Sequence, residues 1–145
     1  MKNRWRTILR LNLAAVLILA AINSLASELK ILTVSGTITS SIGRPLAGCL
    51  VSVVSESRRS APTFTNSNGS FTLETSISPG SSTGSSNPVF LEIYWNRSLV
   101  FRQPLDSLAI AQATPNDGAS GQEMNWQSLL SAGGRVVLQA IKVGK

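Results

Sequence analysis

The sequence predicts an all-β sandwich, and three observations indicate it. Runs in which every second residue is apolar recur along the chain, and this alternation is typical of strands with one buried and one wet face. Gly and Pro residues separate these runs, as tight turns require. Cys49 is the only cysteine, which excludes an intramolecular disulfide, so a hydrophobic core must hold the fold together.

The clearest strands follow two turns, at residues 43–48 and 65–69. Alternation after each turn sets which side chains face the core. The side chains expected to face inward are Cys49, Val51, Val53, Phe71 and Leu73. Cys49 is in phase with two valines, which favours a buried small hydrophobe over a redox or intermolecular thiol.

Seven strands are expected along the chain. They are residues 32–39, 49–56, 62–66, 70–75, 89–95, 98–103 and 135–143. Residues 76–88, between the fourth and fifth strands, are rich in Ser, Gly and Pro and predict a mobile loop. The last strand is apolar on both faces, which predicts that it is covered on both sides.

One short helix is expected before the last strand, at about residues 122–131. Ser120 and Glu123 have the spacing of a capping box, and Gly133-Gly134 can end the helix. The residues that share its apolar face are Trp126, Leu129 and Leu130. This spacing predicts a helix that packs one side against the sandwich.

Three stretches together resemble the carboxypeptidase regulatory-like domain family. That family has a Gly-containing first strand, then G-x-P-L-x-G-A-x-V-x-V, and later T-D-x-x-G-x-F-x-L. The corresponding stretches here are residues 34–38, 43–53 and 65–73. The chain departs from the pattern at Cys49, at Asn66 and at residues 94–97, where the family usually has Ala, Asp and a Gly-Tyr pair.

The resemblance covers residues 32–103 and has consequences for both fold and role. It implies a seven-stranded antiparallel prealbumin-like (Ig-like) sandwich, with the short helix placed before the last strand. Domains of this family are usually appended to a larger enzyme or receptor, whereas here one domain at 27–145 is expected to form nearly the whole mature chain. The resemblance therefore implies an accessory module whose partner is a separate protein.

The N-terminal segment has the order of features typical of a secretory signal peptide. Four basic residues precede the apolar run 13–22, and Ser24-Leu25-Ala26 offers small residues for cleavage after Ala26. A membrane-spanning helix needs about 20 apolar residues, which is longer than this run. We therefore expect residues 1–26 to be a signal peptide, and the mature protein to be periplasmic or extracellular with no stable membrane span.

The positive charge of the chain depends partly on that segment. Four of its 13 Lys and Arg residues lie before position 11. The other basic residues are scattered apart from Arg58-Arg59, which is expected to be a solvated hairpin tip, and none forms a run interleaved with aromatics. Nucleic-acid binding is therefore not expected.

The chain contains no histidine. This excludes Ser-His-Asp and Cys-His catalysis and His-ligated zinc. The seven acidic residues suggest no pair for general acid and base catalysis. We therefore expect no catalytic residue, no metal site and no cofactor, and an enzyme is the third of three functional hypotheses.

The first hypothesis is a non-enzymatic, exported module that binds a protein or serves as a structural accessory, with another exported protein or an envelope component as its partner. The second is a carbohydrate-binding or small-ligand-binding module that uses exposed aromatics. The candidate partner-binding residues are Phe90, Tyr94, Trp95 and Arg97. If residues 91 and 93 face the core, Phe90 and Tyr94 face outward, and Glu92 faces water. Either the helix at 122–131 covers this apolar surface, or a partner docks on it.

Overall fold

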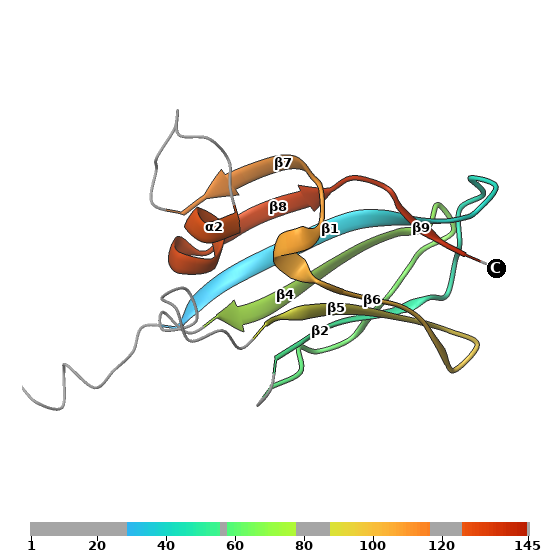
Figure 1. Cartoon of the computed structure of the whole chain (residues 1–145), viewed down its shortest axis with the longest axis horizontal. Coiled ribbons are helices and arrows are strands. Elements are labelled where there is room, and N and C mark those ends of the chain that lie inside the picture. Colours follow the sequence, from blue (N-terminus) through green and yellow to red (C-terminus); the bar gives the residue numbers. More distant parts are fainter. Residues whose placement is uncertain (1–28, 56–57, 78–87, 117–125, 145) are drawn as a thin grey trace, which may run out of the picture.

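A computed structural model describes residues 29–55, 58–77, 88–116 and 126–144. Within these ranges the chain forms strands packed into two facing sheets, with one short α-helix and one 3-10 turn (Figure 1). The elements in order are β1 (Lys30–Ser40), β2 (Leu50–Val54), β3 (Thr63–Phe64), β4 (Ser70–Ile77), β5 (Phe90–Trp95), β6 (Ser98–Pro104), η1 (Leu105–Ser107), β7 (Ile110–Pro115), α2 (Trp126–Ala132), β8 (Gly134–Leu138) and β9 (Ile141–Val143). The expected β-sandwich with one short helix is confirmed.

The two sheets differ in how their strands pair. The four-stranded sheet has the order β3-β2-β5-β6, and all its pairs are antiparallel. The five-stranded sheet has the order β4-β1-β8-β7, with β9 also pairing with β1. There β1 runs parallel to both β8 and β9. The expectation of seven strands, all antiparallel, is therefore wrong: the described residues form nine strands with two parallel pairings.

One of the two additional strands arises because the expected last strand is two strands. Leu138 and Ile141 are both buried although they are three residues apart, so the alternation changes phase between them. The intervening Gln139 donates its backbone N–H to the carbonyl of Ala109 at 2.9 Å, outside the β1 ladder. The prediction that this strand is covered on both sides is also wrong, because Val137 is 39% exposed.

The other additional strand is β7, in a region expected to be a connection. Its sequence places only Ile110 and Ala113 against the core, and its register with β8 shifts between Ile110 and Gln112. The period-two signal is therefore weak. Pairing with β8, rather than side-chain burial, determines that this segment is a strand.

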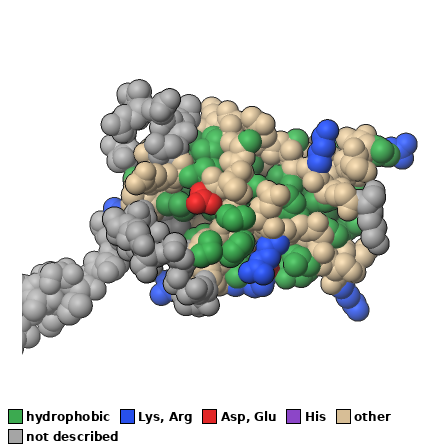
Figure 2. Space-filling model, in the orientation of Figure 1, with side chains coloured by type: hydrophobic (Ala, Val, Ile, Leu, Met, Phe, Trp, Pro, Cys, Tyr) green, Lys and Arg blue, Asp and Glu red, His purple; other side chains and the backbone are tan. Residues whose placement is uncertain are grey.

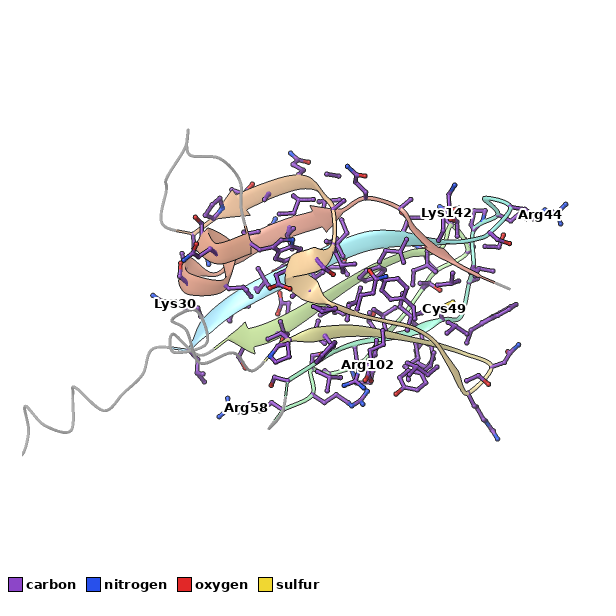
Figure 3. The ribbon with its side chains drawn as sticks, in the orientation of Figure 1. Lys30, Arg44, Cys49, Arg58, Arg102 and Lys142 are labelled. Carbon is purple, nitrogen blue, oxygen red and sulfur yellow. The ribbon has the colours of Figure 1, made fainter. Side chains whose placement is uncertain are left out.

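The core lies between the two sheets and contains every residue that alternation placed inward. Cys49, Val51, Leu91 and Ile93 have no exposed surface, and Phe71 and Leu73 are each 4% exposed. Burial raises the pKa of the Cys49 thiol, while a hydrogen bond with Thr65 opposes this. The buried interpretation of Cys49 is thus confirmed, and Figure 3 shows its place between the sheets.

Helix α2 packs against the five-stranded sheet, where it contacts β1, β7 and β8. Trp126 and Leu129 enter the core, and the Trp126 indole Nε1–H donates to the carbonyl of Leu108 at 2.8 Å. The helix ends at Gly133, whose φ is +73° and where a Cβ would collide with the carbonyl oxygen of Ile31. The expectation that this helix covers the outer face of Phe90 and Tyr94 is wrong.

Some expectations fall on residues outside the described ranges. The expected signal peptide, residues 1–26, lies there, as do residues 122–125 of the expected helix. The expected mobile loop at 76–88 is wrong at its start, because residues 76 and 77 end β4, and most of the rest lies outside the description. Among the described residues, no helix has the length and apolar character needed to cross a membrane.

Candidate functional site: the outer face of the four-stranded sheet

The register of β3, β2, β5 and β6 arranges their outward side chains in three rows across the sheet. We call this surface the outer β2–β5 face. The first row is Phe64, Leu50, Tyr94 and Leu99; the second is Ser52, Glu92 and Arg102; the third is Val54, Phe90 and Pro104. An apolar row, a charged row and a second apolar row thus follow one another.

The first row is the most exposed apolar part of this face. Phe64 is 67% exposed and Leu99 is 48% exposed, whereas Leu50 and Tyr94 between them are half-buried. Phe64 belongs to a two-residue edge strand and Leu99 follows the β5–β6 turn, so the row runs from one edge of the sheet to the other. Large apolar side chains are therefore exposed at both ends of the row.

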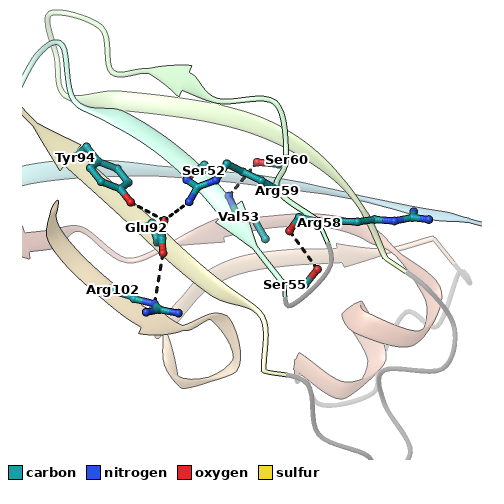
Figure 4. A network of polar contacts seen from close by, with 9 residues as sticks. All are labelled: Ser52, Val53, Ser55, Arg58, Arg59, Ser60, Glu92, Tyr94 and Arg102. Carbon is teal, nitrogen blue, oxygen red and sulfur yellow. Dashed lines mark hydrogen bonds and ion pairs between the residues drawn. The ribbon is translucent and has the colours of Figure 1, made fainter. Parts of the chain in front are cut away.

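The middle row contains a carboxylate held by three other side chains (Figure 4). Arg59 Nη2 donates to Glu92 Oε2 at 2.9 Å, and the Tyr94 hydroxyl donates to the same oxygen at 3.0 Å. Arg102 Nε lies 3.4 Å from Oε1. The Glu92 side chain is only 6% exposed as a result. Glu92 does point to the outer face, but the expectation that it faces water is wrong because these side chains cover it.

The two arginines over Glu92 are bound on one side and exposed on the other. Arg59 also donates from Nη1 to Ser52 Oγ at 2.9 Å, and its side chain remains 48% exposed. The expectation that Arg58-Arg59 is a solvated hairpin tip is therefore wrong for Arg59, which lies back across the sheet. Arg102 is 51% exposed and places its guanidinium carbon 4.4 Å from the centroid of the Phe90 ring.

Arg102 keeps unused hydrogen-bond donors. Only its Nε contacts Glu92, and within the described part of the chain Nη1 and Nη2 make no hydrogen bond. Figure 3 shows Arg102 and Arg58 along the four-stranded sheet, and Figure 2 shows basic and hydrophobic side chains side by side in that area. One buried carboxylate faces two guanidinium groups, so this face carries net positive charge among the described residues.

The other two candidate residues, Trp95 and Arg97, lie at the turn between β5 and β6. Asn96 and Arg97 both have positive φ, at 49° and 66°, as a two-residue type I′ hairpin turn requires. Arg97 is exposed at this turn. Trp95 is 38% exposed but alternates to the opposite side of β5 from Tyr94.

The structure therefore brings together only two of the four candidate residues. Phe90 and Tyr94 share the outer β2–β5 face, but Arg102 lies over the first and the hydroxyl of the second is bound to Glu92. The residues that sequence reasoning missed are Phe64, Leu99, Arg59 and Arg102. Counting outward residues on β3 and β6 could have found Phe64 and Arg102, but Leu99 faces outward only because of the register shift in β6, and Arg59 lies outside the four strands.

The outer face of the five-stranded sheet is different in composition. The outward residues of β1 after Ile31 are Thr33, Ser35, Thr37 and Thr39. Ser35 and Thr72, on neighbouring strands, hydrogen-bond through their hydroxyls at 3.0 Å. Val137 is the exposed apolar residue opposite Ser35. Apart from Val137 and from Ile31, which is 54% exposed, the outward residues of β1 and their neighbours on this face are mainly polar.

No cluster of three or more Cys, Asp or Glu side chains that could hold a metal ion is found within residues 29–55, 58–77, 88–116 and 126–144. Cys49 is buried in the core, away from the outer β2–β5 face.

Comparison with known proteins gives limited similarity. No protein-family model matches the chain, and no curated protein matches it. An intradiol ring-cleavage dioxygenase from Tetranychus urticae is similar in structure with a TM-score of 0.48 and 12% identity, over 79% of this chain and 81% of that one. A 3-chlorocatechol 1,2-dioxygenase from Rhodococcus opacus 1CP gives 0.46 and 13%, over 83% of this chain and 62% of that one.

A third similar structure is the dioxygenase domain of a dioxygenase and carbohydrate-binding protein fusion from the cellulolytic bacterium Streptomyces sp. SirexAA-E. Its TM-score is 0.45 and its identity 19%, over 83% of this chain and 82% of that one.

These comparisons correct the family expectation. The assignment to the carboxypeptidase regulatory-like family is wrong, because no family model matches the chain. The T-N-x-x-G stretch at residues 65–69, which contributed to the resemblance, is explained by the hydrogen bonds that its own side chains make. Thr65 Oγ1 accepts the N–H of Cys49 and donates to the carbonyl of Leu46, and Asn66 Oδ1 accepts two backbone N–H groups of the following turn.

Gly69 is also required by the local geometry of this turn. Its φ is +71°, and a Cβ there would collide with the carbonyl oxygen of Ile38. The spacing T-N-x-x-G is thus what this particular turn needs to close against β1. A turn of this kind is a property of local backbone geometry, so its motif does not identify a family.

Proposed function

We propose that this protein is a non-enzymatic β-sandwich that acts as a protein-binding or structural accessory module, and that the outer β2–β5 face is its binding surface. The observation that carries the proposal is the exposed apolar row from Phe64 to Leu99 beside half-exposed arginines. Contiguous apolar surface rimmed by polar groups marks interaction sites. Arginine and aromatic side chains are also the types enriched in protein interfaces.

Two parts of the proposal rest on the sequence. Export to the periplasm or the cell exterior rests on the basic start, the apolar run 13–22 and the small residues before position 27. The non-enzymatic role rests on the absence of histidine from the chain and on the lack of a paired-carboxylate signal. N-terminal sequencing of the native protein should begin at Ser27; a mature species that retains Met1 would contradict export by cleavage.

A carbohydrate-binding module is the alternative, and the side-chain arrangement favours it less. Sugar rings stack on aromatic faces that lie together and are accessible. Here Arg102 lies over Phe90, the Tyr94 hydroxyl is bound to Glu92, and Trp95 alternates to the other side of the sheet. The aromatics of β5 therefore do not form one open platform.

The proposal is tested with substitutions at the exposed ends of the apolar row. Leu99→Ser and Phe64→Ser remove apolar surface without touching the Glu92 network, whereas Tyr94 is a poor probe because its hydroxyl takes part in that network. Val137→Ser is the matched control on the opposite face. Each tagged variant is recovered from its host after cross-linking, and its melting temperature is measured.

The expected result is a defined partner captured by the wild type and by Val137→Ser, and reduced by Leu99→Ser and Phe64→Ser with nearly unchanged melting temperatures. Equal capture by all four proteins would contradict the proposed surface. Capture of no partner by any of them would contradict the binding role.

A further inference from the structure

We propose that the partner of the outer β2–β5 face is an acidic polypeptide segment that adds to the edge of β6 as an extended strand. The inference rests on the proposed function and specifies the chemistry of its partner. Three observations support it: the unpaired edge of β6, the free donors of Arg102, and the position of Leu99 and Arg102 on the same strand and face.

The edge of β6 offers backbone groups in the right place. Within the described residues β6 pairs with β5 alone and is the last strand of its sheet. Its other edge therefore presents N–H and C=O groups without strand partners, and extended segments commonly bind such edges through backbone hydrogen bonds. The opposite edge strand, β3, is only two residues long and offers little backbone.

Charge complementarity points to an acidic segment. Strand β6 has the sequence SLVFRQP and contains no acidic residue. Arg102 uses Nε for Glu92 and has two terminal nitrogens for a second carboxylate, which a planar guanidinium can bind with two parallel hydrogen bonds. Arg59 already donates hydrogen bonds to Ser52 and Glu92, and its guanidinium adds positive charge to the outer β2–β5 face. A carboxylate on the added strand would therefore have the two terminal nitrogens of Arg102 as its hydrogen-bond donors.

The alternation of β6 also sets a pattern for the segment. Leu99 and Arg102 both face outward, because β6 shifts register between its pairings with Ile93 and Tyr94. Outward side chains of an added strand are two residues apart, about 7 Å. We therefore expect an acidic residue opposite Arg102 and an apolar residue two positions away, on the side of Leu99.

A second copy of this chain fits less well as the occupant. Self-pairing of β6 would bring two strands without acidic residues together, with Arg102 on each. Like charges directly opposite each other on adjacent strands are destabilising. The other explanation of Arg102 is protection of the edge, since charged residues and bulges on edge strands discourage pairing. The experiment below separates these explanations.

The test uses a phage-displayed library of random twelve-residue peptides, selected on the purified protein as the cell processes it. Selection is repeated on Arg102→Gln, on Leu99→Ser, and on Arg135→Gln, an exposed arginine of the other sheet. The most enriched peptide and its Asp/Glu→Asn/Gln version are then measured by calorimetry. Amide hydrogen exchange locates the bound peptide. Binding of polygalacturonate tests an acidic polysaccharide as the occupant, and sedimentation of the protein alone tests a second copy of the chain.

The expected result is enrichment of peptides with an acidic residue two positions from an apolar one. Affinity should fall roughly tenfold on Arg102→Gln and on removal of the peptide carboxylate, and stay unchanged on Arg135→Gln. Amides of β6 should gain protection. Melting temperatures of all variants show whether a loss is due to unfolding rather than to the missing side chain.

Four outcomes would overturn the inference: no enrichment, enrichment of peptides without acidic residues, binding that Arg102→Gln leaves intact, or Arg102-dependent binding of polygalacturonate or of a second copy instead of a peptide. A failure of this inference can be distinguished from a failure of the proposed function. If Leu99→Ser and Phe64→Ser weaken partner capture while no acidic peptide protects β6, the binding face stands and strand addition is wrong.

Discussion

The two outer faces of this sandwich are built by the same backbone alternation but differ in the side chains that point outward. On β1 the outward residues after Ile31 are Ser and Thr, and the Ser35 and Thr72 hydroxyls bond to each other across strands. On β2 and β5 they include Leu50, Phe90 and Tyr94, around a buried carboxylate. The backbone alternation alone does not require this difference in composition.

The apolar face is partly covered by its own long side chains. The guanidinium of Arg102 lies over Phe90, and Arg59 reaches across to Glu92. Long arginine stems can cover apolar surface while their charged ends stay in water. This cover reaches the second and third rows of the face but not Phe64 and Leu99, which stay exposed. The open part of the outer β2–β5 face is therefore its first row.

The largest expected effect contrasts the inner and outer faces of one strand, β4. Phe71 is 4% exposed and its ring packs on Gly36, whereas Thr72 is exposed and loses only its bond to Ser35 when truncated. Phe71→Ala should lower the free energy of unfolding by about 3–5 kcal/mol, and Thr72→Ala by less than about 1 kcal/mol. Urea denaturation measures both; equal losses would mean that the inward and outward sides are not distinct.

The next effect concerns the charged row of the outer β2–β5 face. Replacing both arginines, as Arg59→Met with Arg102→Met, keeps the apolar stems but leaves the carboxylate of Glu92, 6% exposed, without a cation. Removing the partners of a buried charge is costly, and we expect a loss of about 3 kcal/mol in unfolding free energy.

The control for this prediction restores the balance of charge. Adding Glu92→Gln to the double variant should recover most of the loss, because the buried group is then neutral. Arg135→Met, at an exposed position of the other face, should change the unfolding free energy by no more than about 0.5 kcal/mol. A double variant as stable as the wild type would show that Glu92 does not depend on these arginines.

The smallest effect concerns the β5–β6 turn. Arg97 has a φ of 66°, a conformation that costs a non-glycine residue about 1 kcal/mol. Arg97→Gly should therefore raise the melting temperature slightly or leave it unchanged, while removing a positive charge next to β6. Thermal unfolding followed by circular dichroism measures this; a clear drop in melting temperature would mean that the Arg97 side chain itself stabilises the turn.

Much of the fold could be predicted because alternation and turn chemistry are local. The phases of β1, β2, β4 and β5 follow from their sequences, and the core residues follow from the phases. The missed strand β7 and the break between β8 and β9 could not be predicted this way. Their cause is pairing between segments far apart in sequence, including the parallel pairing of β8 and β9 with β1.

The candidate site was less predictable for the same reason. Alternation placed Phe90 and Tyr94 outward, but whether Glu92 met water depended on Arg59, 33 residues earlier in the chain. Phe64 and Leu99 join the face only through strand pairing and a register shift. The T-N-x-x-G turn misled the family assignment because Thr65, Asn66 and Gly69 satisfy a local backbone requirement.

The most direct test of the central claim is site-specific photo-cross-linking in the native host. A benzoylphenylalanine replaces Leu99 on the outer β2–β5 face in one strain and Val137 on the five-stranded sheet in another, at positions 48% and 39% exposed. If the outer β2–β5 face binds a partner, position 99 should give a discrete, light-dependent adduct and position 137 should give none. Adducts from position 137 alone, equal adducts from both, or none from either would contradict this claim.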